Sequence, residues 1–348
     1  SLEIAQHLIY NKCVAKPYFM FGSYVIYDED LDSSLLILKS WIFQPQGLTS
    51  RFICSFGYTT DEINQSIDGF ANFTFDNRAV LQKLNQHDLP IAIVGSGPSL
   101  QFSLPSLKAN QDKIFIVSAG SSIGPLLENG IRIDLNVVLE RGDDTALDYI
   151  PLISKFPHLC DIPCFRSSTS SPSFNNIFKR NIFFHRPLSA SFTLTLDEDY
   201  GTLPICGPES VNAAFDLSLA LGFRNIYLLG ADFSALRADH HRDPLAIGVS
   251  PRTLDLVERS NKGRTVYTDR TLIAARDALQ STYNLYSSSG CPVSLFRIGE
   301  GIPLAGESTV NSDLLDHLNT IENKSEFMSQ TFKQMKYTMR DPDRINYV

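Results

Sequence analysis

The chain has 348 residues, of which 43% are hydrophobic and 20% are charged, a composition typical of a globular protein with one large core and additions to it. The formal net charge of −8 at pH 7 argues against the general positive field that attracts nucleic acids. No apolar run approaches the roughly 20 residues that a membrane-spanning helix needs, and the first residues lack the basic and apolar parts of a signal peptide. We therefore expect a cytoplasmic protein with no membrane span and no nucleic-acid partner.

The cysteines predict neither a disulfide framework nor a metal site. They are spread over the chain, at positions 13, 54, 160, 164, 206 and 291, and are too few for a small secreted fold held by disulfides. Cys160 and Cys164 are close in sequence, but no second pair at zinc-finger spacing follows them. We expect reduced thiols and no bound metal.

From residue 89 onward, short apolar runs alternate with helical patterns. Residues 1–88 are expected to form a small α/β region without catalytic residues. In the next region, 89–308, we expect strands at 91–94, 114–117, 134–139, 164–166, 182–184, 225–230 and 293–297, and helices at 144–156, 209–221 and 268–287. The composition of Ser167–Ser173 predicts a mobile loop or a lid. Residues 235–265 are expected to form a polar segment over the strand ends, and residues 309–348 are expected to form a helical tail.

Strands that alternate with helices predict an α/β fold with a doubly wound, mostly parallel, Rossmann-like sheet. In such folds, ligands bind in the crevice at the carboxyl ends of the strands. The residues that follow the expected strands are therefore the candidates for a functional site.

A glycine-rich turn, Gly95–Leu100, follows the first buried strand with the sequence Gly-Ser-Gly-Pro-Ser-Leu. Because Gly95 and Gly97 lack side chains, their backbone N–H groups can approach a phosphate or a ribose, and the N-terminus of the following helix favours an anion. Ser99 is placed to cap that helix. The turn matches neither the dinucleotide-binding pattern, since residue 100 is leucine, nor the phosphate-binding loop of ATPases. Taken alone, it is equally well interpreted as a plain connection.

A second turn of small residues, Ser118–Ser122, follows the next strand and offers Ser118, Gly120 and Ser121. Neighbouring strand ends lie side by side in a parallel sheet. We therefore expect this turn and the Gly95–Leu100 turn, including Ser96, to face one nucleotide, one at the ribose and phosphate and the other at the base.

Charged and polar residues follow the later strands. Glu140 ends the third strand, where a carboxylate could hold a ribose, a metal or a sugar hydroxyl, or simply favour the start of a helix. The same two interpretations apply to its neighbours Asp134, Asp143 and Asp144. Gly207, Glu209 and Ser210 precede a helix and could bind a phosphate oxygen or a sugar carboxylate, although ordinary capping explains Ser210 almost as well.

The candidate catalytic residues are Asp232, His240 and His241. Asp232 follows the clearest strand, at the position where doubly wound enzymes place functional residues. The adjacent histidines lie in the polar segment expected over the crevice, and a histidine with a pKa near neutrality is a common general base. Solvent-exposed histidines without a function are the alternative, with metal binding a lesser one.

The ordered set of motifs resembles the central domain of the Maf proteins. The residues concerned are Gly95–Leu100, Ile133–Glu140 (Ile-Asp-Leu-Asn-Val-Val-Leu-Glu), Gly207–Asn212 (Gly-Pro-Glu-Ser-Val-Asn) and Ala220–Phe233 (Ala-Leu-Gly-Phe-Arg-Asn-Ile-Tyr-Leu-Leu-Gly-Ala-Asp-Phe). Maf proteins are motility-associated factors linked to flagellin glycosylation, in a superfamily with the MptE-like pterin pyrophosphokinases. The first and last motifs are also similar to those of bacterial sialyltransferases that use CMP-activated sialic acid. The resemblance covers about residues 89–306.

This resemblance implies that Gly95, Ser96 and Gly97 contact the nucleotide, that residues 118–121 lie near the ribose or base, and that residues 207–210 lie near the phosphate and the sugar carboxylate. Ser96 stands where the sialyltransferases have asparagine. Their catalytic histidine has no counterpart in Asn261–Val266, so His240 or His241 would have to supply the base.

Three other residues enter through the same resemblance. Arg264 and Tyr267 are alternatives for steadying the leaving phosphate. Glu300 lies in a segment that matches the end of the family domain and is expected on the acceptor side.

The resemblance implies transfer of a nonulosonic acid, of the pseudaminic, legionaminic or sialic type, from its CMP donor to Ser or Thr of flagellin, with no certain cofactor. One alternative is an ATP-dependent pterin diphosphokinase, which would need Mg²⁺ and the convergence of Asp134, Glu140 and Asp232. The other is a non-catalytic module of the glycosylation machinery. The sugar, the acceptor and the oligomeric state stay open at this point.

Overall fold

This computed structural model describes residues 78–186, 201–248 and 252–338, together with residues 64, 65, 67–69, 71 and 72. Most of the expected N-terminal region, including Cys13 and Cys54, lies outside the described residues. The residues described between 64 and 72 are helical. The four cysteines that the structure describes, Cys160, Cys164, Cys206 and Cys291, are free thiols.

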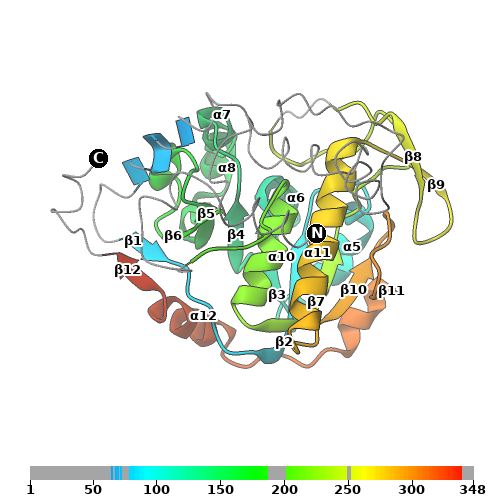
Figure 1. The fold of residues 1–348 in the computed structure, drawn as a ribbon. Coiled ribbons are helices and arrows are strands. Elements are labelled where there is room, and N and C mark those ends of the chain that lie inside the picture. Colours follow the sequence, from blue (N-terminus) through cyan, green and yellow to red (C-terminus); the bar gives the residue numbers. More distant parts are fainter. Residues whose placement is uncertain are drawn as a thin grey trace, which may run out of the picture.

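The centre of the molecule is a ten-stranded sheet in the order β11-β10-β7-β2-β3-β4-β5-β6-β1-β12 (Figure 1). Nine strands run parallel, and β12 pairs antiparallel with β1 at one edge. The strands are β1 (Arg78–Val80), β2 (His87–Val94), β3 (Phe115–Ala119), β4 (Leu135–Val138), β5 (Cys164–Ser167), β6 (Asn181–Phe184), β7 (Phe223–Leu229), β10 (Ser294–Ile298), β11 (Glu307–Val310) and β12 (Lys336–Thr338). A separate antiparallel pair is formed by β8 (Leu256–Arg259) and β9 (Thr265–Thr268). The predicted α/β class with a mostly parallel sheet is thereby confirmed.

The strand order places a topological switch point at β2. From β2 the chain adds β3, β4, β5 and β6 on one side, and then returns to add β7, β10 and β11 on the other side. The loops that leave β2 and its neighbours therefore part in opposite directions and open a crevice at their carboxyl ends.

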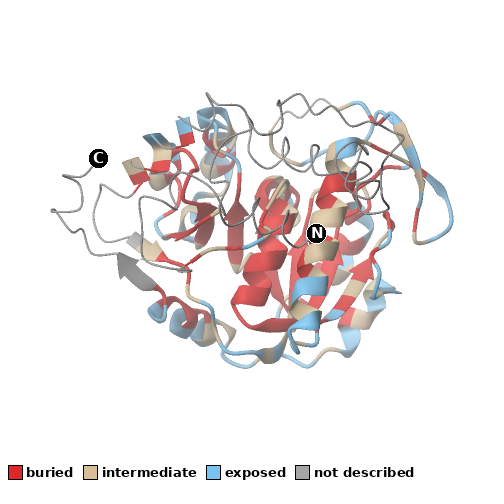
Figure 2. Cartoon of the chain, in the orientation of Figure 1, coloured by how far each residue is buried: buried red, intermediate tan, exposed pale blue. Residues whose placement is uncertain are grey.

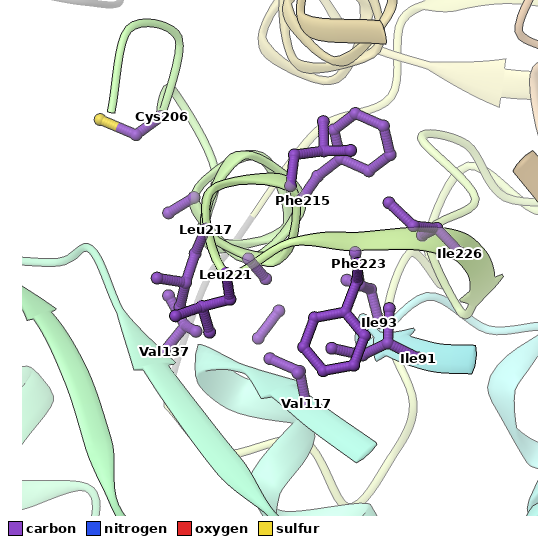
Figure 3. Packing of buried hydrophobic residues seen from close by; sticks show 14 of the residues in the cluster. Ile91, Ile93, Val117, Val137, Cys206, Phe215, Leu217, Leu221, Phe223 and Ile226 are labelled. Atoms are coloured by element: carbon purple, nitrogen blue, oxygen red, sulfur yellow. The ribbon is translucent and has the colours of Figure 1, made fainter. Parts of the chain in front are cut away.

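Helices cover both faces of the sheet because the side chains of each central strand alternate between two apolar layers. Ile91 and Ile93 of β2 face the layer containing α10 (Ser210–Ala220), α11 (Arg270–Ser288) and α12 (Lys324–Lys333). Ala92 and Val94 face the layer with α5 (Leu100–Ala109) and α6 (Ile123–Glu128). Figure 2 shows the central strands and α10 as the buried interior, and Figure 3 shows Ile91, Ile93 and Val117 beneath the apolar side of α10. No described helix is both long enough and apolar enough to cross a membrane.

Most expected elements are present, and the exceptions have local causes. The helix expected at 144–156 is broken into α7 (Asp143–Leu147) and α8 (Ile150–Lys155), because Pro151 lacks an N–H group and favours the first turn of a helix, where it lies in α8. Gly130 and Gly222 have positive φ angles where α6 and α10 end, a conformation that glycine adopts readily. The C-terminal segment contains the expected helix, α12, and also contributes β11 and β12 to opposite edges of the sheet.

Ser167–Ser173 is not the mobile loop or lid that its composition predicted. Residues 167–170 have no exposed surface. Asn72 donates hydrogen bonds to the carbonyl oxygens of Ser168 and Ser170, at 3.0 and 2.7 Å, and the buried guanidinium of Arg166 donates to Ser170 Oγ and to the carbonyl of Ser171. The serines are therefore a hydrogen-bonded part of the interior, since each buried polar group finds a partner.

Candidate functional site

A cavity of about 380 Å³ opens at the carboxyl ends of the central strands. Its wall is made of the turns after β2, β3, β4 and β7, residues between 145 and 149 at the end of α7, the first turns of α10 and α11, and the segment 241–248 with Arg252. This is the crevice at the switch point where the fold class predicts a ligand.

The turn after β2 is shaped by close contact with the end of β7. The N–H of Gly95 donates to the carbonyl oxygen of Leu229 at 2.8 Å, and the N–H of Gly97 donates to that of Gly230 at 2.7 Å. A Cβ atom at either glycine would lie 2.6 Å from the Gly230 carbonyl oxygen. These two N–H groups therefore already have hydrogen-bond partners at the end of β7, so the contact of Gly95 and Gly97 with a nucleotide stays a prediction.

Asp232 fixes the same turn from the opposite side. Its carboxylate accepts hydrogen bonds from the Ser99 N–H at 2.7 Å and from Ser99 Oγ at 2.5 Å. Ser99 thus occupies the N-cap position of α5 without capping it through its own side chain. Burial raises the pKa of Asp232 to about 6, against the lowering effect of the two hydrogen bonds and of Arg297. Asp232 lines the cavity, and both of its oxygen atoms serve to hold the turn.

The turn after β3 lies directly beside the turn after β2. Ser121 Oγ donates to Ser96 Oγ at 2.9 Å, and both residues line the cavity. Ser122 donates to the carbonyl of Val94 at 2.6 Å and lies 3.1 Å from Ser118 Oγ, beneath the surface. The structure therefore brings together the two turns that the sequence singled out, and Ser96 and Ser121 are the hydroxyl groups that they present.

The end of β4 meets the start of α10 at Gly120. Ser210 Oγ donates to Glu140 Oε2 at 2.7 Å. A Cβ at Gly120, whose φ is +56°, would lie 2.9 Å from Ser210 Oγ, so only glycine leaves room for this contact. Glu140 lines the cavity, whereas Ser210 supports it from behind.

Arg252 joins the starts of α10 and α11. Its Nη2 lies 2.9 Å from Glu209 Oε1, and its Nε lies 3.4 Å from Asp269 Oδ2. Glu209 is the N-cap residue of α10, and Asp269 caps α11 by accepting the N–H of Leu272 at 2.8 Å. One guanidinium group thereby positions two helix N-termini at the cavity wall.

The segment 235–248 overhangs the two serine turns. The N–H of Asp243 donates to the carbonyl of Ser96 at 2.7 Å, and the N–H of Ile247 donates to that of Ser121 at 3.2 Å. Arg242 closes the segment on itself by donating to the carbonyls of Ile247 and Gly248, at 2.5 and 3.2 Å. The polar segment expected over the strand ends is therefore present and is attached to both turns.

The two adjacent histidines differ in position. His241 lines the cavity, and its buried Nε2 has no hydrogen-bond partner among the described residues. Burial lowers the pKa of His241, and the charges of Arg252 and Arg242 lower it further. Its imidazole is thus neutral near pH 7 and able to accept a proton. His240 is exposed and does not line the cavity.

The predicted site residues divide between the cavity wall and its support. The wall contains Ser96, Gly97, Gly120, Ser121, Glu140, Glu209, Asp232 and His241. Gly95, Ser99, Ser118, Gly207, Ser210 and His240 do not line it. Arg242 and Arg252 do, and sequence reasoning missed both because an arginine in a polar segment has no distinguishing pattern. The adjacency of Arg242 to the histidine pair was the one available signal.

Other residues considered from the sequence lie away from the cavity. Asp134 precedes β4 and is 2.7 Å from Lys324, whereas Glu140 follows β4 at the other end of the strand, so the convergence required for the kinase alternative does not occur. Arg264 forms an ion pair with Glu300, and neither these two nor Tyr267 lines the cavity. Within the described part of the chain, no three His, Cys, Asp or Glu side chains are grouped so as to hold a metal ion.

Comparisons with known proteins relate this chain to a protein family and to a solved glycosyltransferase structure. Residues 69–237 match the family profile described as 6-hydroxymethylpterin diphosphokinase MptE-like, so the chain contains an MptE-like domain. The structure is similar to that of a MAf glycosyltransferase from Magnetospirillum magneticum AMB-1, with a TM-score of 0.70 and 26% sequence identity over 81% of this chain and 43% of that chain. The chain therefore spans less than half the length of that protein. No curated protein matches it. The resemblance to the MptE-like and Maf proteins stated from the sequence is confirmed.

Proposed function

We propose that the chain is a glycosyltransferase that moves a nonulosonic acid from a CMP-activated donor to a Ser or Thr hydroxyl of flagellin. The observation that carries the proposal is the 2.9 Å hydrogen bond between Ser121 and Ser96, which places the turns after β2 and β3 side by side on one cavity. The similarity to a MAf glycosyltransferase supports the transfer reaction. The sugar class and the acceptor rest on the family resemblance.

The cavity offers the groups that such a transfer needs. The acceptor hydroxyl gives its proton to His241 Nε2 as its oxygen bonds to the anomeric carbon, and the bond from that carbon to the phosphate oxygen breaks to release CMP. A neutral imidazole suits the first role. The charges of Arg242 and Arg252 and the N-termini of α10 and α11 stabilise the departing phosphate.

A pterin diphosphokinase is the second candidate, because the matched family profile carries that description. Transfer of diphosphate from ATP proceeds with metal ions that bridge the phosphates. The separation of Asp134 from Glu140 removes one carboxylate of the predicted set, which makes this candidate the weaker one.

Ligand titration separates the two candidates. We expect CMP to raise the thermal unfolding temperature and to bind more tightly than UDP, GDP or ATP with Mg²⁺, as measured by calorimetry. Ser96→Ala should weaken CMP binding by roughly 3- to 10-fold, the usual effect of one lost hydrogen bond. Ser154→Ala is the control, because Ser154 is an exposed residue of α8 outside the cavity wall. Stabilisation by ATP with Mg²⁺ and not by CMP would overturn the transferase proposal in favour of the kinase.

A further inference from the structure

The N-termini of α10 and α11 converge on one side of the cavity. Val211 and Leu272, from the first turns of these helices, both line it. Figure 1 shows the two helices side by side on the same face of the sheet. A helix N-terminus carries a partial positive charge and unpaired N–H groups, so two of them together favour an anion in the space between.

Arg252 adds a full positive charge at the same place. Its Nε and Nη2 are directed by Asp269 and Glu209, and 19% of its side chain is exposed. Its Nη1 is buried and has no hydrogen-bond partner among the described residues. The Nε and Nη2 sides of the planar guanidinium are therefore fixed, and the N–H groups of Nη1 are left without a partner in the described part of the chain.

The cavity wall carries carboxylates as well as guanidinium groups, since Glu140, Asp148, Glu209 and Asp232 line it beside Arg242 and Arg252. The place for one more anion is therefore local, at the Nη1 of Arg252 that no described residue partners. Glu209 and Asp269 occupy the N-cap positions of the two helices, and their negative charges offset the partial positive charges there. Arg242 contributes a second positive charge to the cavity wall. A guanidinium suits a carboxylate in particular, because both groups are planar and their hydrogen bonds are strengthened by the charges.

We propose that Arg252 makes the enzyme select donors whose sugar carries a carboxylate, by donating Nη1–H to that carboxylate. This inference rests on the proposed function, since it assumes a CMP-linked donor in the cavity. In such a donor the sugar carboxylate and the phosphate are bonded to the same anomeric carbon. The two anionic groups therefore enter together, and Arg252 and the paired helix N-termini can serve both.

The test compares an acid with its neutral ester in matched proteins. The ligands are CMP, CMP-3-fluoro-N-acetylneuraminic acid, which is slow to react, and the methyl ester of that sugar nucleotide. Their affinities are measured by calorimetry for the unaltered chain, for Arg252→Gln and Arg252→Lys, and for Arg264→Gln, an exposed arginine paired with Glu300 outside the cavity wall. Arg252→Lys keeps the positive charge, and it replaces Arg252→Gln in the test if that variant fails to fold, since Arg252 also links two helices.

We expect the unaltered chain and Arg264→Gln to prefer the acid over the ester by roughly tenfold or more, as one charge-assisted hydrogen bond provides. In Arg252→Lys the preference should fall below about threefold, with the affinity for CMP little changed. Equal binding of acid and ester by the unaltered chain overturns the role of Arg252 but leaves the CMP donor in place. An equal loss of CMP and acid binding in the Arg252 variants assigns the residue to the phosphate and also overturns it. If CMP itself does not bind, the proposed function fails and this inference fails with it.

Discussion

The floor of the cavity is formed by the turn after β2 and by Asp232 after β7, and the segment 235–248 overhangs it. These two regions are held by different kinds of contact. On the floor, Gly97 leaves no room for a side chain, and Asp232 uses both carboxylate oxygens to bind Ser99. The overhanging segment 235–248 touches the two serine turns through the backbone of Asp243 and Ile247. Its residues 236–240 are exposed.

This difference indicates that the floor gives the cavity its shape and that the overhanging segment supplies its reactive groups. Residues of the floor determine how β2, β7 and α5 fit together, so their loss should unfold the protein. The overhanging segment carries a polar group without a partner among the described residues, His241 Nε2, so the loss of this group should change binding or rate and leave stability nearly intact. Substitutions on the two sides can test this separation.

The largest effect is expected for His241→Asn. If Nε2 accepts the acceptor proton, the transfer rate, followed as CMP release, should fall roughly 1000-fold, while CMP affinity and the unfolding temperature change little. His240→Asn is the matched control, because that exposed neighbour does not line the cavity. Equal rates for both variants would exclude His241 as the base.

The same residue determines the expected pH dependence. Because burial and the neighbouring arginines lower the pKa of His241 below its usual value of 6.5, its neutral form predominates from that lowered pKa upward. The rate should rise as the pH increases through the lowered pKa and stay level near pH 7. A rate that keeps rising above pH 7 would contradict this assignment.

On the floor, Gly97→Ala should lower the free energy of unfolding by about 3 kcal/mol, because the new Cβ would lie 2.6 Å from both Asp232 Oδ2 and the Gly230 carbonyl oxygen. Gly142→Ala is the control, since the nearest atom to its Cβ would be the Asp144 N–H nitrogen at 3.9 Å. Chemical denaturation of both variants measures the difference. A stable Gly97→Ala protein that merely binds CMP poorly would show that the floor is adaptable.

The sequence predicted the positions of the central strands well, whereas their order in the sheet came only from the structure. Ile91–Val94 and Asn225–Gly230 are continuous apolar runs, and such runs identify strands that are buried on both faces. The glycine turn after the first of them correctly marked the cavity. What it could not reveal is that the N–H groups of Gly95 and Gly97 donate to β7, since that contact joins residues more than 130 positions apart.

The wrong prediction for Ser167–Ser173 and the failure to identify Arg252 have the same cause, because both depend on contacts between distant segments of the chain. Ser167–Ser173 has the composition of a loop, and it is buried because Asn72, nearly 100 residues earlier, supplies the hydrogen bonds. Arg252 acquires its role only when the starts of α10 and α11 meet. Pro151 was the exception, because the break between α7 and α8 follows from a local rule that the helical pattern had obscured.

The smallest effect is expected where the overhanging segment meets the body of the protein. Gly124 lies in the first turn of α6, and a Cβ there would overlap the carbonyl oxygen of Leu245. The overlapping atom belongs to the backbone, so Gly124→Ala should lower the free energy of unfolding by about 1 kcal/mol, because alanine favours a helix over glycine by up to about 1 kcal/mol and offsets only part of the cost of the overlap. It should also push the segment away from Ser121. CMP affinity should fall about threefold, and the Ile247 amide, which donates to Ser121, should exchange its hydrogen faster. Faster hydrogen exchange at Ile247 with unaltered CMP affinity would show that the segment does not help to hold the nucleotide. Slower unfolding with no change in hydrogen exchange would show that α6 and the segment adjust together.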